Sequence, residues 1–411
     1  MAIPFWLPAA LQFFSCAAVS CVLRHHLGYH GVWAAALSVA SLTGLFCGSL
    51  FWGAVADYVG NIKGVLSVAH ALAMICVPFN VMPSIASSYP LLACLTVLVS
   101  FLLAADTGLV DTICLAAADA QGDYGEMRSW SCIGCGLICV VVGAGLALTG
   151  PWMIYSTFVV LQVPLLIMLL FFLPSPRLSR EVAQKREVKI MECLTGNKTS
   201  ISEVFLYGLC LSLIEIFGPV YYIKFLGTSS FTFGAAVLIM CLAEIVVFRF
   251  IARALRDLHA SWAWVRDACY ALLALRCLGY CLVPASMPWA ALALEVLHGF
   301  NFAAMWYITV KRADTLAPPG AQATMQSLTS GTYFFLSMGV GSMVWGHCLE
   351  APPSGIGWQR SFQLCSFLTI AALAWNRCAK TPQPIDAPRA DVPSDDLPLV
   401  EPPEQTPNPK P

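Results

Sequence analysis

Ionisable side chains recur inside long apolar stretches of this sequence, where a charge is difficult to accommodate. They are Asp106, Asp111, Glu215, Glu244, Arg276, Glu295 and His298. Placing one such group at the centre of a hydrophobic helix costs about 2.5 to 3.5 kcal/mol on insertion scales, so each needs a partner or a water-filled cavity. A passive membrane anchor does not need them. Their presence indicates a protein that handles a solute or protons.

Three polar residues, Glu295, His298 and Asn301, follow one another at intervals of three. At about 100° per residue this spacing keeps them near one face of a helix, and a rise of about 1.5 Å per residue from Pro288 puts His298 near the membrane midplane. Histidine changes protonation near neutral pH, and a neighbouring carboxylate helps it retain the proton. Two interpretations stay open: a proton relay that lines a cavity, or a hydrogen-bonded knot that joins helices.

The two intramembrane arginine sites also need anions. Arg276 can meet either Glu295 or a carboxylate of the substrate. Asp111 and Arg128 lie near the same end of neighbouring antiparallel segments, so we expect them to approach each other. Such an ion pair serves either as a structural clasp or as a contact that switches.

The acid Glu215 comes shortly before Gly218 and Pro219. This order favours an interruption of the helix, and broken helices expose backbone groups at transporter binding sites. A simple kink beside a shielded acid is the alternative.

The elements that position these groups follow from composition. Of 411 residues, 58% are hydrophobic and 11% charged, against roughly 25% charged in a soluble domain. No soluble core buries so much apolar surface, so the outer surface must face hydrocarbon. The net charge of -1 gives no argument for nucleic acid as a partner. We expect a multi-pass protein of a lipid bilayer, with the particular membrane undetermined.

Turn residues and charges divide the chain into apolar segments of about 20 residues, the length of a membrane span. With boundaries uncertain by about 2 to 4 residues, the segments are approximately 5–27, 32–55, 63–83, 89–114, 128–149, 151–173, 201–225, 231–252, 261–284, 288–310, 321–347 and 358–378. The sequence therefore predicts an all-α membrane protein with 12 transmembrane helices. We expect two six-helix bundles, 1–173 and 201–378, around a basic cytosolic linker, 174–200.

Lysine and arginine are concentrated in alternate connections, which predicts that both termini are cytosolic. Prolines recur from residue 382 to the end among acidic and polar residues. Residues 379–411 are therefore predicted to be a disordered cytosolic tail. Either a recruiting role or a plain solvated terminus fits this composition.

Metal and enzyme chemistry find little support. The 18 cysteines are scattered through apolar runs, and the one C-x-x-C, Cys132 and Cys135, lacks the second pair or histidines of a zinc site. HExxH, GxSxG and clustered nucleophile and base residues are absent from the sequence. We expect no enzyme activity, no metal and no cofactor.

One connection carries a recognisable motif. Residues 53–63 read GAVADYVGNIK and resemble the G-x-x-x-D-x-x-G-x-x-K/R loop of the major facilitator superfamily. The resemblance implies a gating loop in which Gly53, Asp57, Gly60 and Lys63 take part. In that family the Asp joins a charge and helix-dipole latch that closes the cytosolic side, here with Lys63 as the basic member.

Three further stretches are similar to the MFS-1-like, or major facilitator associated, group, which contains lactose permease, phenylpropionate permeases and nucleoside proton symporters. YGEMRSW at 124–130, followed by Ile133 and Gly134, resembles the opening of span five in that group. AEI at 243–245 resembles its span eight, and LHGFNFA at 297–303 its span ten. The resemblance covers residues 5–378 and implies a major facilitator fold.

The resemblance also implies roles. In lactose permease an acid of span four and the arginine of the span-five motif bind the sugar, while a span-nine arginine and a span-ten histidine and glutamate manage the proton. An amide stands where that glutamate is expected, and an amide cannot carry a proton. The expected substrate-binding set is therefore Asp111, Arg128 and Asn301, and the proton-coupling set is Glu244, Arg276, Glu295 and His298.

Together these features predict a secondary active transporter that moves a small organic solute by alternating access. Proton symport and uncoupled facilitated diffusion both stay open, and a transport-inactive receptor or scaffold of the same fold is the rival class. The expected partners are a small-molecule substrate and protons, for a monomeric chain. The charges are compatible with sugars, nucleosides, aromatic acids or other small organic solutes.

Overall fold

The computed structural model describes residues 6–23, 32–121, 123–149, 152–173, 190–257, 261–284 and 286–379. Within these ranges the regular structure is entirely helical, and no strand is present. Each apolar segment expected from the sequence coincides with a helix or an interrupted helical rod. The proline-rich tail expected from residue 379 lies outside the described residues except for Ala379.

The first half contains eight α-helices and two short helices of other types among its described residues. They are α1 (Trp6–Leu23), α2 (Val32–Val59), α3 (Ile62–Cys76), the 3-10 helix η2 (Val77–Val81), α4 (Pro83–Ala86), α5 (Tyr89–Leu103), α6 (Ala105–Gln121), α7 (Tyr124–Thr149), α8 (Trp152–Ile167) and the π-helix η3 (Met168–Phe172). The expected fourth rod is therefore divided into α5 and α6 by a turn at Ala104, shortly before Asp106.

The second half has more interruptions. Its described elements are α9 (Ile190–Gly196), α10 (Lys198–Val220), the π-helix η5 (Tyr221–Phe225), α11 (Ser230–Asp257), α12 (Trp262–Leu282), the 3-10 helix η6 (Pro288–Ala290), α13 (Ala291–Glu295), the π-helix η7 (Gly299–Ala304), α14 (Met305–Leu316), α15 (Gln322–Ser330), the π-helix η8 (Gly331–Leu336), α16 (Ser337–Leu349) and α17 (Trp358–Cys378). π-helical turns occur often at functional sites.

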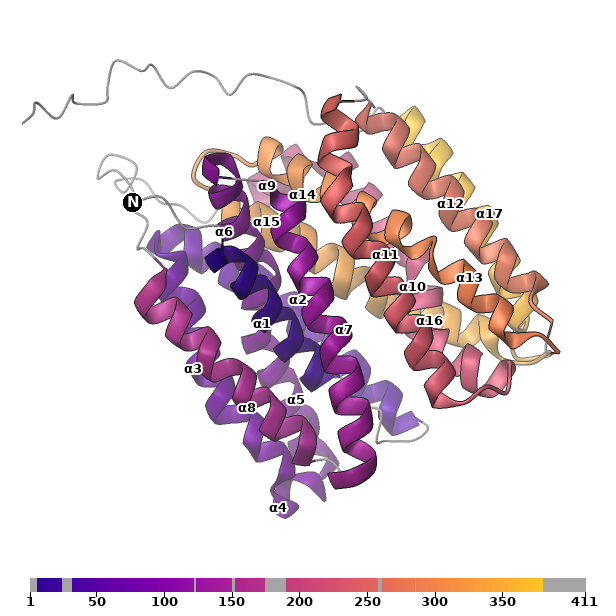
Figure 1. Cartoon of the computed structure of the whole chain (residues 1–411), viewed down its shortest axis with the longest axis horizontal. Coiled ribbons are helices and arrows are strands. Elements are labelled where there is room, and N and C mark those ends of the chain that lie inside the picture. Colours follow the sequence, from indigo (N-terminus) through magenta and orange to yellow (C-terminus); the bar gives the residue numbers. More distant parts are fainter. Residues whose placement is uncertain are drawn as a thin grey trace, which may run out of the picture.

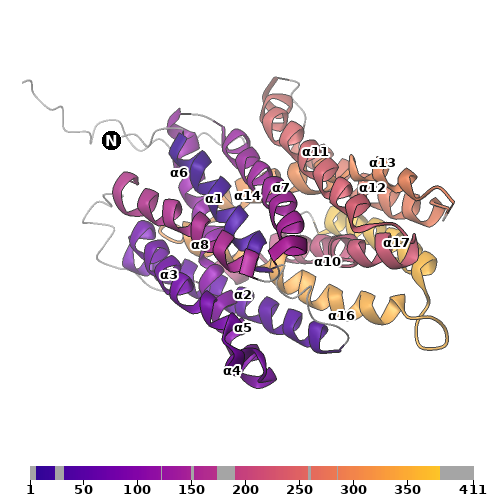
Figure 2. The ribbon, with the colours of Figure 1, turned by 60° about the horizontal axis from the view of Figure 1, so that its bottom comes forward.

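The helices form two groups that lie side by side (Figures 1 and 2). In the first group α1 packs against α7 and α8, and α2 packs against α5. In the second, α10 packs against α16 and α17, and α12 packs against α17. The groups meet where α15 contacts α2 and α6, and where α11 contacts α7. A site at this junction is therefore built by both groups.

Part of the expected linker is structured. Residues 190–196 form α9, which packs against α15, and α10 begins at Lys198. Cys193 is buried in this contact, and the side-chain amide of Asn197 donates to the carbonyl oxygen of Cys193 at 3.0 Å. Residues 174–189 of the linker lie outside the described residues.

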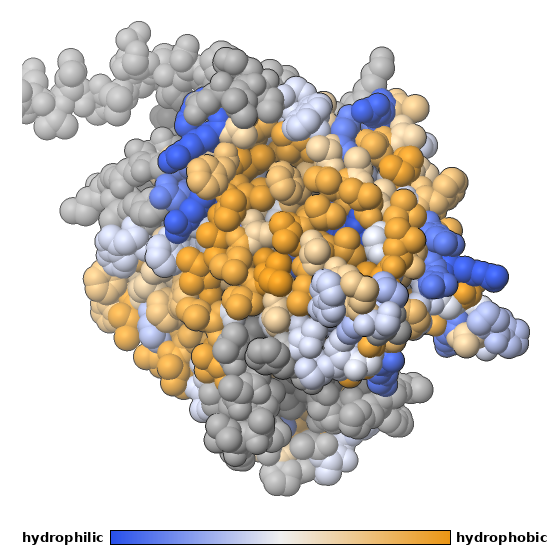
Figure 3. All heavy atoms as spheres, turned by 45° about the vertical axis from the view of Figure 1, so that its right-hand side comes forward, coloured by the Kyte–Doolittle hydropathy of each residue, from blue (hydrophilic) through white to orange (hydrophobic). Residues whose placement is uncertain are grey.

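Apolar side chains cover much of the outer surface. Figure 3 shows them over the broad middle of one face, with hydrophilic residues toward its edges. Among the described residues, six helical stretches are long and apolar enough to cross a membrane: Val39–Val59, Ile62–Asn80, Tyr89–Ala118, Lys198–Phe225, Thr232–Arg256 and Pro288–Leu316. Such a surface is stable only against hydrocarbon, as expected for a multi-pass membrane protein.

Candidate functional site

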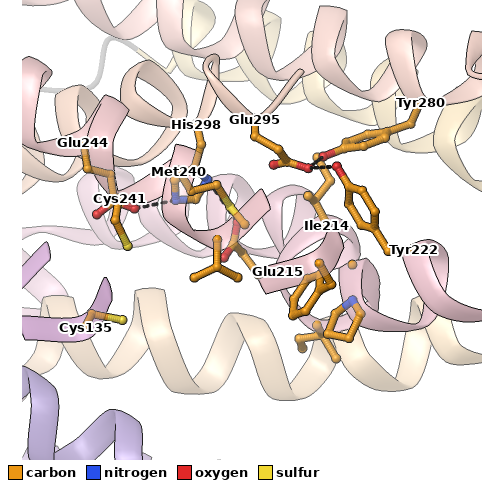
Figure 4. Close-up of a pocket in the computed structure, with 15 residues that line it drawn as sticks. Cys135, Ile214, Glu215, Tyr222, Met240, Cys241, Glu244, Tyr280, Glu295 and His298 are labelled. Carbon is orange, nitrogen blue, oxygen red and sulfur yellow. Dashed lines mark hydrogen bonds and ion pairs between the residues drawn. The ribbon is translucent and has the colours of Figure 1, made fainter. Parts of the chain in front are cut away.

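A cavity of about 410 Å³ lies at the junction of the two groups, mostly among helices of the second (Figure 4). Its lining includes residues of α10, η5, α11, α12 and α13, and Cys135 of α7. Three of its side chains are carboxylates, those of Glu215, Glu244 and Glu295, and His298 lies among them. The volume is within the range of small-molecule sites.

Glu295 anchors one end of the cavity. It is 1% exposed and forms an ion pair with Nη2 of Arg276, which is fully buried. The hydroxyls of Tyr222 and Tyr280 both donate to Oε1 of Glu295, at 2.6 and 2.7 Å (Figure 4). Of the two partners that the sequence allows for Arg276, the structure brings Glu295. Charge-assisted hydrogen bonds therefore fix the position of this carboxyl group.

His298 lies between two other carboxylates. Its Nε2 is 2.8 Å from Oε1 of Glu244, and its Nδ1 is 3.3 Å from Oε1 of Glu215. The same Nδ1 is 3.0 Å from Nη1 of Arg276. An imidazole nitrogen either accepts or donates a hydrogen bond. Nδ1 therefore accepts from Arg276 when the ring is neutral, and donates to Glu215 when the ring is protonated.

Two helix irregularities position these side chains. Pro219 lacks an N–H, so the carbonyl group of Glu215 loses its helical donor. The interruption that the sequence favours after Glu215 does not occur at Pro219 itself, because α10 continues to Val220 and then widens into η5, which carries Tyr222. The second irregularity is at His298, which is the residue directly before η7.

Asn301 does not join Glu295 and His298 at the cavity, although the sequence spacing predicts that the three lie near one face of a helix. A π-turn has more residues than an α-turn, so η7 rotates Asn301 away from the cavity. Asn301 is fully buried, and its side-chain amide donates to the carbonyl oxygen of Cys269 at 3.2 Å. The residues that line the cavity do not include Asn301.

A second polar cluster lies within the first group. Nη1 of Arg128 is 3.1 Å from Oδ1 of Asp111 and 3.0 Å from Oε1 of Gln12. The amide of Gln12 and the hydroxyl of Tyr124 also donate to Oδ1 of Asp111, at 2.8 and 3.0 Å. The structure thus joins Asp111 and Arg128 as the antiparallel segments predict. Neither is among the residues that line the cavity.

Arg128 nevertheless faces the second group. Its guanidinium carbon is 5.9 Å from the ring centroid of Trp306 on α14, a cation–π distance. Trp306 is 1% exposed. The cluster around Arg128 is therefore covered by α14 in this conformation.

The motif at 53–63, which covers the end of α2, the turn after it and the start of α3, joins the two groups. Asp57 accepts hydrogen bonds from the backbone N–H groups of Ala323 and Thr324, at 3.2 and 2.6 Å. These residues form the N-terminus of α15, where a negative charge complements the helix dipole. Lys63 lies elsewhere, because its Nζ donates to the carbonyl oxygen of Leu173 at 2.7 Å.

Gly53 within α2 and Gly60 in the turn after it differ in their surroundings. A Cβ at Gly53 would lie 2.5 Å from Cβ of Ser327, so only glycine allows α2 and α15 to approach this closely. Gly60 has a φ of 65° and ends the turn after α2. The four motif residues thus hold the loop against both α15 and the end of η3.

The same end of the molecule carries a second joint. The hydroxyl of Tyr307 on α14 donates to Oδ1 of Asp123 at 3.1 Å. Partial burial raises the pKa of the Asp123 carboxyl from its ordinary 3.8. Beside it, a Cβ at Gly125 would lie 2.2 Å from the carbonyl oxygen of Phe248, so α7 and α11 also approach too closely for any side chain.

Sequence reasoning missed several buried polar partners. His70 of α3 lies 2.5 Å from Asp106, and both are almost fully buried. Arg312 of α14 lies 2.6 Å from Glu203 of α10. A histidine in an apolar segment is a usable signal, so His70 could have been found. Glu203 and Arg312 lie near segment ends, where charge is common and carries little information.

The chain is similar to known proteins in sequence. A model of the MFS_1 like family matches residues 9–359. Maltose permease of Geobacillus stearothermophilus is 38% identical over 93 residues, which cover 22% of this chain and 23% of the permease. Major facilitator superfamily domain-containing protein 6-like of Danio rerio is 22% identical over 256 residues, 60% of this chain and 45% of that protein. These matches span less than half the length of either relative.

Solved structures agree in fold. The nucleoside transporter NupG superimposes with a TM-score of 0.64 at 17% identity, over 92% of this chain and 98% of NupG. The human organic anion transporter MFSD10 (TETRAN) gives 0.65 at 15% identity, over 90% and 98%. The family match covers most of the chain and confirms the resemblance seen in its motifs. The chain belongs to the MFS_1 like family of the major facilitator superfamily, and its similarity to a permease and to transporters indicates a transporter rather than an enzyme.

Proposed function

We propose that this protein is a secondary transporter that moves a small organic solute across a membrane by alternating access, with proton movement coupled to the solute. One observation carries the proposal: a cavity of small-molecule size in which His298 lies between Glu215 and Glu244. A static helical anchor has no use for such a cavity. The relatives' names, which include a maltose permease and a nucleoside transporter, support transport in general.

The histidine supplies the coupling. Neutral His298 accepts from Arg276 and leaves Glu215 facing a lone pair, whereas protonated His298 donates to Glu215. Each protonation state therefore favours a different arrangement of the same side chains. A proton biases a conformational equilibrium only if it binds the two states differently. This network provides that difference.

Alternating access fits the position of the contacts. Asp57, Asp123 and Gly125 join the two groups at the end where α10 begins. The cavity instead lies along the later half of α10 and the start of η5, from Ile214 to Tyr222. We propose that breaking the joint at the first end and closing the cavity at the other exposes the site to the opposite side of the membrane.

In that second state, Arg128 and Asp111 contribute to substrate binding. Arg128 already reaches the junction and is covered there by Trp306. Movement of α14 away from α7 uncovers its guanidinium, with Asp111 as its fixed counterion. Asn301 acts as a positioning residue that ties η7 to α12.

We further propose 12 membrane crossings, two six-helix bundles at 1–173 and 201–378, and cytosolic termini. The distribution of lysine and arginine supports this orientation. It puts the Asp57 end, with its gating loop, on the cytosolic side. The tail from residue 379 then lies in the cytosol, and transport does not require it.

The test is untargeted metabolite uptake by proteoliposomes that contain the purified chain, with and without a pH gradient. The proposal predicts at least one metabolite whose accumulation depends on both the protein and the gradient. Protein-free vesicles of the same lipid composition control for leakage. If no metabolite distinguishes protein-containing vesicles from empty ones, a transport-inactive receptor or scaffold becomes the better description.

A further inference from the structure

The charges around the cavity do not balance. The charged and titratable groups that face Glu215 are Glu244 on α11, Arg276 and Tyr280 on α12, Glu295 on α13, His298 directly before η7, and Tyr333 on η8. Arg276 compensates Glu295 through their ion pair. His298, even when protonated, must serve both Glu215 and Glu244. Counted as formal charges, three carboxylates therefore outnumber the cations Arg276 and His298 in either state of the imidazole.

Glu215 is the carboxylate where this excess is accessible. Its side chain is 31% exposed, against 11% for Glu244 and 1% for Glu295. Its carboxylate lies 3.3 Å from Nδ1 of His298, which is longer than the 2.8 Å between His298 and Glu244. A carboxylate away from bulk water needs a counterion. Among the described residues that line the cavity, none is a lysine or an arginine.

The rest of the cavity wall consists largely of aromatic rings and a polarisable thioether. The rings of Tyr222, Phe233 and Tyr280 and the thioether of Met240 line the cavity together with Glu215. Tyr222 and Phe233 lie close, with ring centroids 5.9 Å apart. Aromatic faces attract cations, most strongly where water is excluded. A carboxylate beside aromatic rings recognises an ammonium group attached to an apolar body.

From this arrangement we infer that the substrate is an organic cation, an amine with an apolar or aromatic body, whose ammonium group binds at Glu215 in competition with a proton. The inference rests on the proposed function and gives its substrate class. Because one positive charge replaces another, the cation enters as a proton leaves. Coupling is then an exchange of amine for proton rather than symport.

Three small molecules of similar shape and different charge test this inference. They are phenethylamine, which is a cation, phenylpropionate, an anion, and phenethyl alcohol, which is neutral. Binding to the purified full chain in detergent micelles is measured by calorimetric titration between about pH 5 and pH 8, the range in which a histidine changes charge. Phenethylamine is expected to bind best, and its affinity falls on acidification, by up to about tenfold per pH unit for one-for-one competition.

Variants of Glu215 make the test specific. Glu215→Gln is expected to weaken amine binding by about tenfold or more, the worth of one charge-assisted hydrogen bond. Glu215→Asp keeps the charge and is expected to keep the preference for the cation at reduced affinity. Glu350→Gln removes an exposed carboxylate at the end of α16, far along the chain from the cavity lining, and leaves amine binding unchanged.

The inference is overturned if phenylpropionate or phenethyl alcohol binds as tightly as phenethylamine, if amine binding is absent at millimolar concentrations, or if Glu215→Gln binds the amine like the wild type. Proteoliposome uptake separates it from the proposed function. If the amine binds but is not taken up, the result contradicts the proposed transport and agrees with the proposed cation site. If only neutral or anionic solutes are taken up, the result contradicts the proposed cation site and agrees with the proposed transport.

Discussion

The two groups of helices each contain a buried arginine paired with a carboxylate, and the two pairs are built differently. Asp111 in the first group receives donors from Arg128, Gln12 and Tyr124 on a single oxygen, all from its own group. In the second group a histidine stands between carboxylates and shares one nitrogen with an arginine. The first arrangement has one hydrogen-bonding pattern. The second has two, which depend on a proton.

The two networks suit the two groups of helices to different roles in one fold. A polar network whose groups have fixed partners is rigid, because every alternative leaves a buried group unpaired. A network with competing partners can change at low cost. We therefore expect the first group to supply a fixed binding surface and the second to supply the switch.

The largest expected effect comes from removing Arg276. Arg276→Ala leaves the fully buried Glu295 without its cation, and breaking a buried pair in this way costs about 3 to 5 kcal/mol. Arg128→Ala should cost less, because Arg128 is 8% exposed whereas Arg276 is fully buried, so the carboxylate left behind is less completely shielded from water. Thermal unfolding of the two variants in detergent measures the difference. Equal thermal unfolding midpoints for the two variants would contradict the expected difference in stability between the two arginine–carboxylate networks.

The fixed network should matter for transport more than for folding. Arg128→Ala and Asp111→Ala are expected to abolish uptake while the protein still reaches the membrane, because each removes a group of the proposed binding surface. Uptake and surface level are measured in the same cells. Normal uptake rates in both variants would exclude this pair from the site.

The switchable network should respond to pH. Glu244→Gln removes the carboxylate closest to His298, at 2.8 Å from Nε2, and leaves an amide in its place. We expect an altered pH profile of uptake with an unchanged membrane level. Glu350→Gln serves as the control. A profile that overlays the wild type's would clear Glu244 of coupling.

The joint between the groups can be loosened sterically. Gly125→Ala places a Cβ 2.2 Å from the carbonyl oxygen of Phe248 and should push α7 and α11 apart. Gly136→Ala is the matched control on the same two helices, because its Cβ meets Cys241 at 3.4 Å, close to an ordinary contact. Hydrogen exchange of α11 should rise in the first variant and not in the second. Equal exchange in both would argue against a closed joint at Gly125.

The smallest expected effect concerns Asp123. Burial in the joint raises its carboxyl pKa above 3.8, so the closed joint binds a proton more tightly than an open, hydrated one. As the pH falls from the raised pKa of Asp123 toward 3.8, the closed joint should become more stable relative to the open one. This stabilisation should be complete below pH 3.8. Hydrogen exchange around Asp123 and Tyr307 measures it. Asp123→Asn should abolish the pH dependence, and its persistence would point to another group.

Much of this architecture could be read from the sequence. The apolar segments gave the helical rods, because only helices satisfy the backbone in hydrocarbon, and the approach of Asp111 to Arg128 follows from an antiparallel pair of neighbours. The site was harder to predict. The position of Asn301 depends on a π-turn, and a pattern read with the α-helical period misplaces every residue beyond that turn.

Contacts between residues distant in the sequence could not be predicted either. Tyr222 and Tyr280 bind Glu295 across three different helical segments, and no local spacing reveals such a contact. Gln12 reaches Asp111 from the first helix for the same reason. A sequence shows which groups are too costly to leave unpaired. Which partners they find depends on tertiary packing.

The central claim is that solute movement through this cavity is coupled to a proton on the cluster of His298, Glu215 and Glu244. Proteoliposomes loaded with a pH-sensitive dye test it directly, with protein-free vesicles as the control for passive permeation. A transported solute should change the internal pH in wild-type vesicles, and this change should be lost in Glu244→Gln. Protein-dependent solute entry with no accompanying pH change in the wild type would contradict the account.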